Sequence, residues 1–108
     1  IYASSKAAIA RWVRRTAVTP EWAGAGIPLN AIAPGTIVTP MIQAMLDSPE
    51  GLAAIDGAVP MPLSGHARPQ QVAPLLAWLV SPENSHMTGQ VVFIDGGADA
   101  VLRSDAVW

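Results

Sequence analysis

Residues 90–97 read Gln90-Val91-Val92-Phe93-Ile94-Asp95-Gly96-Gly97, and this stretch decides the fold class. Its middle part is a short apolar run, which is typical of a strand that is buried on both faces. The two glycines after the run predict a turn, because glycine adopts backbone conformations that other residues avoid. A strand buried on both faces indicates a parallel sheet that is covered by helices.

A second strand is predicted over residues 27–33, with Pro28 tolerated near its start. Pro34-Gly35 follows it and predicts a turn. Each predicted strand thus leads into a turn that contains glycine. In open α/β sheets, ligands bind at the carboxyl ends of the strands, so residues after these turns are candidates for a binding site.

Helices are predicted around the strands from apolar residues at helical spacing. One helix is expected over residues 3–18, and one or two short helices over residues 41–58, interrupted by Pro49 and Gly51. Another helix is expected to start near Pro69. The tail after residue 97 shows no strong period. Alternating helices and apolar strands predict an α/β fold with a parallel sheet.

Two strands are too few for a sheet that is stable alone, and the edge of such a sheet would be unpaired. We therefore expect residues 1–108 to be a single, partial domain, the C-terminal portion of a longer protein. The position of Ile1 directly before a candidate catalytic residue favours the same interpretation.

The composition excludes several classes of protein. The net charge of −2 argues against a nucleic-acid-binding protein. The chain has no cysteine, so we predict no disulfide framework, and no metal site is indicated. No continuous apolar run approaches the ~20 residues that cross a membrane, and no signal peptide is visible. A cytoplasmic location is the expectation.

Tyr2 and Lys6 are the only tyrosine and the only lysine in the chain, and they are four residues apart. At this spacing two residues share one face of a helix, so an ammonium group can lie beside a phenol. A nearby cation and the helix N-terminus both favour the phenolate and lower its pKa from an ordinary value near ~10. The pair is a candidate general acid/base. Taken alone, the motif is also compatible with a helix-start tyrosine and a surface lysine.

Four motifs occur in one order, and together they resemble the C-terminal half of the short-chain dehydrogenase/reductase family. The resemblance covers essentially the whole chain and implies a Rossmann-like, doubly wound parallel sheet whose N-terminal strands precede Ile1. The family's Gly-rich dinucleotide loop, its Asn-Ala-Gly segment and its catalytic serine would also lie before Ile1. The motifs are Tyr2-Ala3-Ser4-Ser5-Lys6, Asn30-Ala31-Ile32-Ala33-Pro34-Gly35, Thr39-Pro40-Met41 and Gly89-Gln90-Val91-Val92-Phe93-Ile94-Asp95-Gly96-Gly97.

The resemblance implies a role for each matching residue. Tyr2 is the expected proton donor and acceptor, and Lys6 is expected to lower its pKa and to bind the nicotinamide ribose. Both residues are also expected among those that bind the cofactor. Pro34 and Gly35 are expected to pack against the nicotinamide ring. The residues expected to hold its carboxamide are Ile37, through its backbone, and Thr39, through its hydroxyl. Thr39 is also a good helix N-cap, and both roles are compatible.

The end of the chain, from Ile94 to Arg103, resembles the subgroup of bacterial 3-alpha-hydroxysteroid dehydrogenases/carbonyl reductases, which also contains coniferyl-alcohol dehydrogenases. This resemblance implies an apolar hydroxysteroid-like or aryl alcohol as substrate, and it favours NAD over NADP. In the family, the loop after Thr39 covers the substrate. Met41, Met45 and Met61 are therefore expected in the substrate pocket, since methionine suits a bulky apolar ligand, although ordinary helix packing explains each one equally well.

The sequence thus predicts an NAD(P)-dependent oxidoreductase that interconverts an alcohol and a carbonyl compound by hydride transfer. Its expected partners are the small-molecule substrate and copies of itself, as a homodimer or homotetramer when full length. Two alternatives remain open. One is an inactive truncated fragment, and the other is an assembly module that keeps the fold without turnover. A departure from the family pattern, Pro28 where arginine is frequent, concerns the local helix end and not the chemistry.

Overall fold

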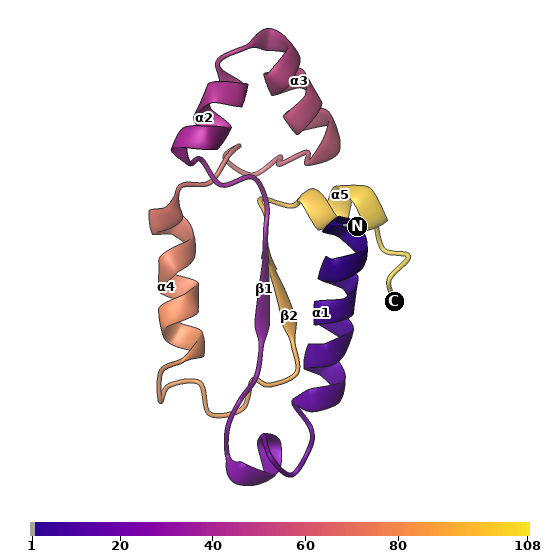
Figure 1. Cartoon of the computed structure of the whole chain (residues 1–108), viewed down its shortest axis with the longest axis vertical. Helices are drawn as coiled ribbons and strands as arrows, with labels where there is room; N and C mark the ends of the chain where they lie inside the picture. Colours follow the sequence, from indigo (N-terminus) through magenta and orange to yellow (C-terminus); the bar gives the residue numbers. More distant parts are fainter. Residues whose placement is uncertain (1) are drawn as a thin grey trace. The chain divides into compact units, whose positions relative to one another are not determined.

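The structure, a computed structural model, describes residues 2–108, and it describes side chains from Ser4 onward (Figure 1). Two strands pair in parallel, which confirms the predicted α/β class. The elements in chain order are α1 (Tyr2–Thr16), the 3-10 helix η1 (Ala23–Ala25), β1 (Ala31–Pro34), α2 (Pro40–Leu46), α3 (Pro49–Ala58), α4 (Pro69–Leu79), β2 (Val91–Ile94) and α5 (Ala98–Arg103).

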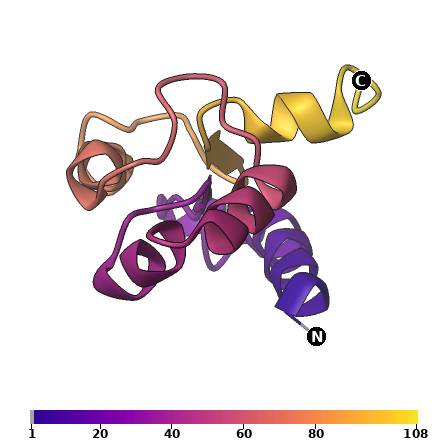
Figure 2. The same cartoon turned by 90° about the horizontal axis from the view of Figure 1, so that it is seen from above.

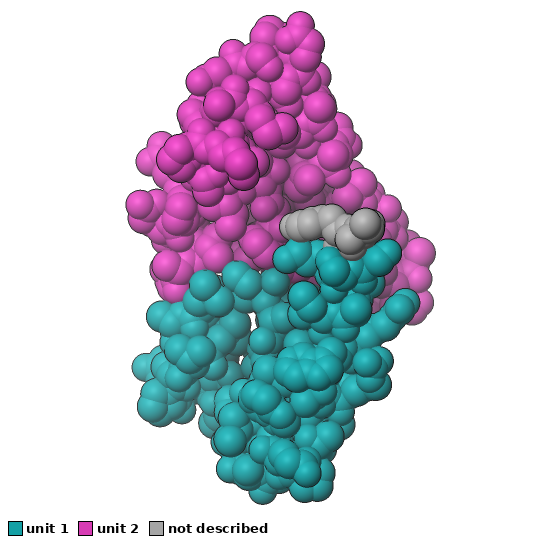
Figure 3. Space-filling model, in the orientation of Figure 1, with its two compact units in different colours: residues 1–32, 75–92 teal, residues 33–74, 93–108 magenta. Residues whose placement is uncertain are grey.

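The chain forms two compact units (Figure 3). The first comprises residues 1–32 and 75–92, and the second comprises residues 33–74 and 93–108. Each strand begins in the first unit and ends in the second. No helix in the described part of the chain is long and apolar enough to cross a membrane.

In the first unit, β1 begins at Ala31, so the prediction of a strand from residue 27 was wrong in its first half. Pro28 has no N–H to donate to a ladder. The N–H of Leu29 donates to the Thr88 hydroxyl (3.0 Å). The Asn30 side chain donates to the Met87 carbonyl (2.9 Å) and accepts from the Gln90 N–H (3.0 Å). Before Ala31, these side-chain hydrogen bonds therefore accompany a single backbone bond, from the Gly89 N–H to the Leu29 carbonyl (2.8 Å).

The C-terminal end of α1 and the residue directly after it contribute to the core of the first unit. Val13 and Ala17 are buried, and Ala17 lies against Gly89. Arg14 Nη1 donates to the Gly89 carbonyl (3.3 Å). These contacts hold the end of α1 beside the residues that lead into β2.

In the second unit, α2 and α3 contact each other and lie side by side (Figure 2). Pro49 is the first residue of α3, as expected of a helix-starting proline. Gly51 was predicted to interrupt the helix, but it lies inside α3. A Cβ atom at this position would lie 2.1 Å from the Met45 carbonyl oxygen, so glycine is required for the close approach of the α2 end.

The helix α4 begins at Pro69 as predicted. Pro74 lies within the continuous helix. Val72 and Leu79 of α4 are buried, one in each unit.

The short helix α5 was missed by the sequence analysis, which found no period after residue 97. Its N-terminus is capped by the Asp95 carboxylate, which accepts hydrogen bonds from the N–H groups of Gly97 (3.0 Å) and Asp99 (2.7 Å). One turn later, Arg103 binds Asp99 and lowers the pKa of that carboxyl through its hydrogen bonds. The signal that could have found this helix is the aspartate directly before two glycines.

We expect Asp95→Ala to lower the free energy of unfolding by about 1 kcal/mol, because the first N–H groups of α5 lose their acceptor. Urea denaturation measures the change. Asp105→Ala, which removes an exposed carboxylate from the following turn, is the matched control and should change stability little. Equal losses in the two variants would contradict the capping role.

Candidate functional site

The acid/base candidates are on α1, in the first unit. Tyr2 is the first residue of α1, and Lys6 follows one helical turn later with an exposed side chain. The helix therefore provides the predicted spacing of the two residues. The side chain of Tyr2 lies outside the described part of the structure, so the predicted contact between phenol and ammonium stays a prediction.

The candidate dinucleotide residues follow the carboxyl end of β1, in the second unit. The Gly35 N–H donates to the Ile94 carbonyl (3.2 Å), which extends the pairing beyond β1. A Cβ atom on Gly35 would lie 2.8 Å from Met61 Cε and 3.1 Å from Asp95 Cα. Only glycine fits here without displacing these neighbours, and the backbone of the turn is closely enclosed on this side.

Ile37 forms an isolated parallel bridge with Ala67. The bridge consists of two hydrogen bonds, from the Val38 N–H to the Ala67 carbonyl (2.7 Å) and from the Ala67 N–H to the Thr36 carbonyl (3.0 Å). In a parallel bridge of this type, the N–H and carbonyl of the central residue point away from the partner strand. No described residue hydrogen-bonds these two groups of Ile37. The turn therefore presents one donor and one acceptor from the same residue.

Thr39 is the N-cap of α2, and its hydroxyl accepts a hydrogen bond from the Ile42 N–H (3.3 Å). The capping interpretation is thus confirmed. The hydroxyl proton is not used by this bond, so the side chain can still donate to a ligand. Thr39 is exposed, as is Pro34 at the start of the segment.

The three methionines predicted in the substrate pocket differ in their surroundings. Met41 and Met45 are one turn apart on α2, and their side chains are 74% and 46% exposed. Met61 is half-buried, and its sulfur accepts a hydrogen bond from the Thr36 N–H (3.3 Å). The structure therefore brings Met61 together with Gly35 and Thr36. The importance of Ala67 at this turn was not visible in the sequence, because an isolated bridge has no local pattern.

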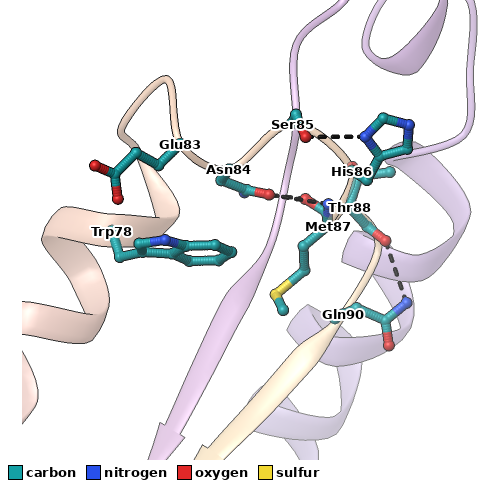
Figure 4. A pocket seen from close by; sticks show the side chains of 8 residues that line it. All are labelled: Trp78, Glu83, Asn84, Ser85, His86, Met87, Thr88 and Gln90. Carbon is teal, nitrogen blue, oxygen red and sulfur yellow. Dashed lines mark hydrogen bonds between the residues drawn. The ribbon is translucent and has the colours of Figure 1, made fainter.

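A large cavity of the first unit, about 500 Å³, lies elsewhere (Figure 4). Its walls come from Trp78 and from the loop before β2, where hydrogen bonds join Ser85 to His86 and Gln90 to Thr88. None of the predicted site residues lines it. We place the candidate site after β1 instead, because ligands of α/β proteins bind at the carboxyl ends of strands and this loop precedes the amino end of β2.

Comparison with known proteins identifies the family. The family described as Enoyl-(Acyl carrier protein) reductase matches residues 1–99. A curated 3-alpha-hydroxysteroid dehydrogenase/carbonyl reductase from Comamonas testosteroni is 43% identical over 102 residues. The chain belongs to the short-chain dehydrogenase/reductase family. The resemblance inferred from the four motifs is confirmed.

The curated relatives are much longer than this chain. A glucose 1-dehydrogenase from Gluconobacter oxydans is 38% identical over 89% of the chain. The chain spans 38% of the Comamonas protein and 35% of the Gluconobacter protein, well under half of either relative. It matches the C-terminal portion of the family's Rossmann-fold structures.

Two solved short-chain dehydrogenase/reductase structures were obtained with dinucleotides. The 3-alpha-hydroxysteroid dehydrogenase from Pseudomonas sp. B-0831, complexed with NADH, matches with a TM-score of 0.79 and 39% identity, over 96% of this chain and 40% of that one. ElxO with NADP bound matches with a TM-score of 0.75 and 35% identity, over 90% and 38%. Relatives of this chain thus bind either dinucleotide.

Proposed function

We propose that this chain carries the acid/base pair and the nicotinamide-binding turn of an NAD(P)-dependent oxidoreductase that interconverts an alcohol and a carbonyl compound. The observation that carries the proposal is the pair of backbone groups on Ile37. A primary carboxamide offers both N–H donors and a carbonyl acceptor. The outward N–H and carbonyl of Ile37 match such a group, so the residues present fit a nicotinamide.

The neighbouring residues complete the turn as a binding surface. Thr39 accepts a hydrogen bond from the Ile42 N–H. Its own O–H would donate a hydrogen bond to the carboxamide. Pro34 and Gly35 offer a flat surface without a long side chain, against which a planar ring packs. These residues would orient the nicotinamide ring, since the bound dinucleotide itself supplies or takes the hydride.

Tyr2 and Lys6 perform the proton transfer. During alcohol oxidation, the phenolate of Tyr2 takes the hydroxyl proton as the carbon loses its hydride. In the reverse direction, the phenol returns that proton to the carbonyl oxygen. Lys6 favours the phenolate electrostatically, which makes Tyr2 an effective base near neutral pH.

For the substrate, we propose an apolar hydroxysteroid-like or aryl alcohol. The relatives named as hydroxysteroid dehydrogenases support this class, and the exposed Met41 and Met45 on α2 suit a bulky apolar ligand. The match to a glucose 1-dehydrogenase makes a polyol the competing class. NAD is favoured over NADP, and a cytoplasmic homodimer or homotetramer remains our expectation. Residues 1–108 are proposed to form part of one Rossmann-like domain.

The test is a substrate panel with the purified full-length protein that contains this chain. We expect reduced nicotinamide to form from NAD in the presence of a hydroxysteroid or an aryl alcohol, and kcat/KM to be at least about tenfold lower with glucose, since a hydrophobic pocket leaves hydroxyl groups unpaired. Dinucleotide binding is measured separately by calorimetry. A higher kcat/KM with glucose than with the hydroxysteroid or aryl alcohol would overturn the proposed substrate class. The proposed reaction type would be unaffected.

The alternative functions have different outcomes in the same experiment. A protein that binds dinucleotide without any turnover is an assembly or binding module. A protein that neither binds dinucleotide nor turns over substrate is an inactive remnant of the family.

A further inference from the structure

The side chain of Met61 lies between two glycine turns, one after each strand. On one side, it closely approaches Gly35 and accepts the Thr36 N–H through its sulfur (3.3 Å). On the other side, a Cβ atom on Gly96 would lie 3.1 Å from Met61 Cβ and 3.2 Å from Met61 Cε. All of these residues belong to the second unit.

The backbone around Met61 is fixed independently of its side chain. The Leu63 N–H donates to the Gly96 carbonyl (2.9 Å), and Gly96 has a φ of 62°, in the left-handed region that favours glycine. A side chain at either glycine would occupy the space that Met61 fills. The two glycines therefore create a slot for an unbranched side chain, and the sulfur is placed against a backbone N–H.

We infer that Met61 is a positioning residue for the turn that binds the dinucleotide, rather than a residue that contacts substrate. Its sulfur holds the N–H of Thr36, the residue directly before Ile37. Thr36 also provides the carbonyl of the bridge to Ala67, so its peptide groups set the direction of the Ile37 N–H. An effect of Met61 on dinucleotide affinity rests on the proposed function. An effect of Met61 on hydrogen exchange at the Thr36 N–H does not.

The test is Met61→Leu, which keeps the apolar volume but removes the acceptor and introduces a branch. We expect the Thr36 amide to exchange its hydrogen about threefold to tenfold faster, and the Kd for dinucleotide to rise by a similar factor, as loss of one weak hydrogen bond predicts. The KM for the alcohol should stay within about twofold, since the substrate is not contacted. Met61→Gln keeps an unbranched stem and an acceptor, so it should restore part of the Thr36 protection.

The matched control is Met87→Leu, the same exchange in the wall of the large cavity of the first unit (Figure 4). It should leave Thr36 exchange and dinucleotide affinity unchanged. Unaltered Thr36 exchange in both Met61→Leu and Met61→Gln would overturn the inference, as would a higher KM for the alcohol with unchanged dinucleotide Kd. Failure of the wild-type protein to bind dinucleotide would overturn the proposed function instead, and the exchange rates would still decide the role of the sulfur.

Discussion

Tyr2→Phe is expected to lower kcat by about 10²–10⁴-fold, the usual contribution of a general acid/base. The exchange keeps the aromatic ring and removes only the hydroxyl that carries the proton. Dinucleotide affinity should change little, because the groups proposed to hold the carboxamide lie on Ile37 and Thr39. Steady-state kinetics and calorimetric Kd values separate the two effects. Unchanged turnover in Tyr2→Phe would refute the catalytic assignment.

The role of Lys6 has a signature in the pH dependence. Lys6→Met removes the cation that we propose to favour the phenolate of Tyr2, so deprotonation of the phenol should become less favourable. Alcohol oxidation needs the deprotonated phenol, and the rise of kcat/KM should therefore move to higher pH. Arg11→Met, on the same helix and also exposed, is the matched control. A uniform loss of rate without a shift of the profile would indicate that Lys6 only binds ribose.

Asn84→Ala is expected to lower the free energy of unfolding by about 3 kcal/mol, since each buried polar group left unpaired costs about 1–3 kcal/mol. Asn84 is only 7% exposed. Its amide donates to the carbonyls of Leu79 (3.0 Å) and Met87 (3.1 Å), and its side-chain oxygen accepts from the Met87 N–H (2.9 Å). The side chain thus joins the end of α4 to the residues that lead into β2. Urea denaturation measures the effect.

Two further variants show whether the hydrogen bonds of Asn84 explain the loss of stability in Asn84→Ala. Ser85→Ala changes the exposed neighbour and should leave the free energy of unfolding within about 0.5 kcal/mol of wild type. Asn84→Asp keeps the acceptor but points a carboxyl at two carbonyl oxygens, which raises its pKa in the folded state. Because the pKa of this carboxyl is higher in the folded state than in the unfolded state, the variant gains stability relative to wild type as the pH falls toward the ordinary pKa of an aspartate. A loss that is independent of pH would show that packing, and not hydrogen bonding, explains the effect.

The helices and strands were predictable where the signal is local. The apolar run at 91–94 and the helix start at Pro69 are properties of neighbouring residues, and the structure has both. Errors arose where distant groups compete for the backbone. Residues 27–30 resemble a strand, but the side chains of Thr88 and Asn30 make most of the hydrogen bonds there, beside one backbone bond from the Gly89 N–H to the Leu29 carbonyl. The helix α5 depends on the Asp95 carboxylate more than on any apolar period.

By itself, the sequence determined the fold class, the family and the candidate residues, because motifs three to nine residues long record local geometry and chemistry. The tertiary structure alone decided what surrounds those residues. It placed Met61 between Gly35 and Gly96, paired Ile37 with Ala67, and buried Asn84 among three backbone groups. The contacts of Met61 and Ile37 join segments that are distant along the chain, whereas Asn84 bonds residues only three and five positions away. Chain folding sets such distances, and no local periodicity encodes them.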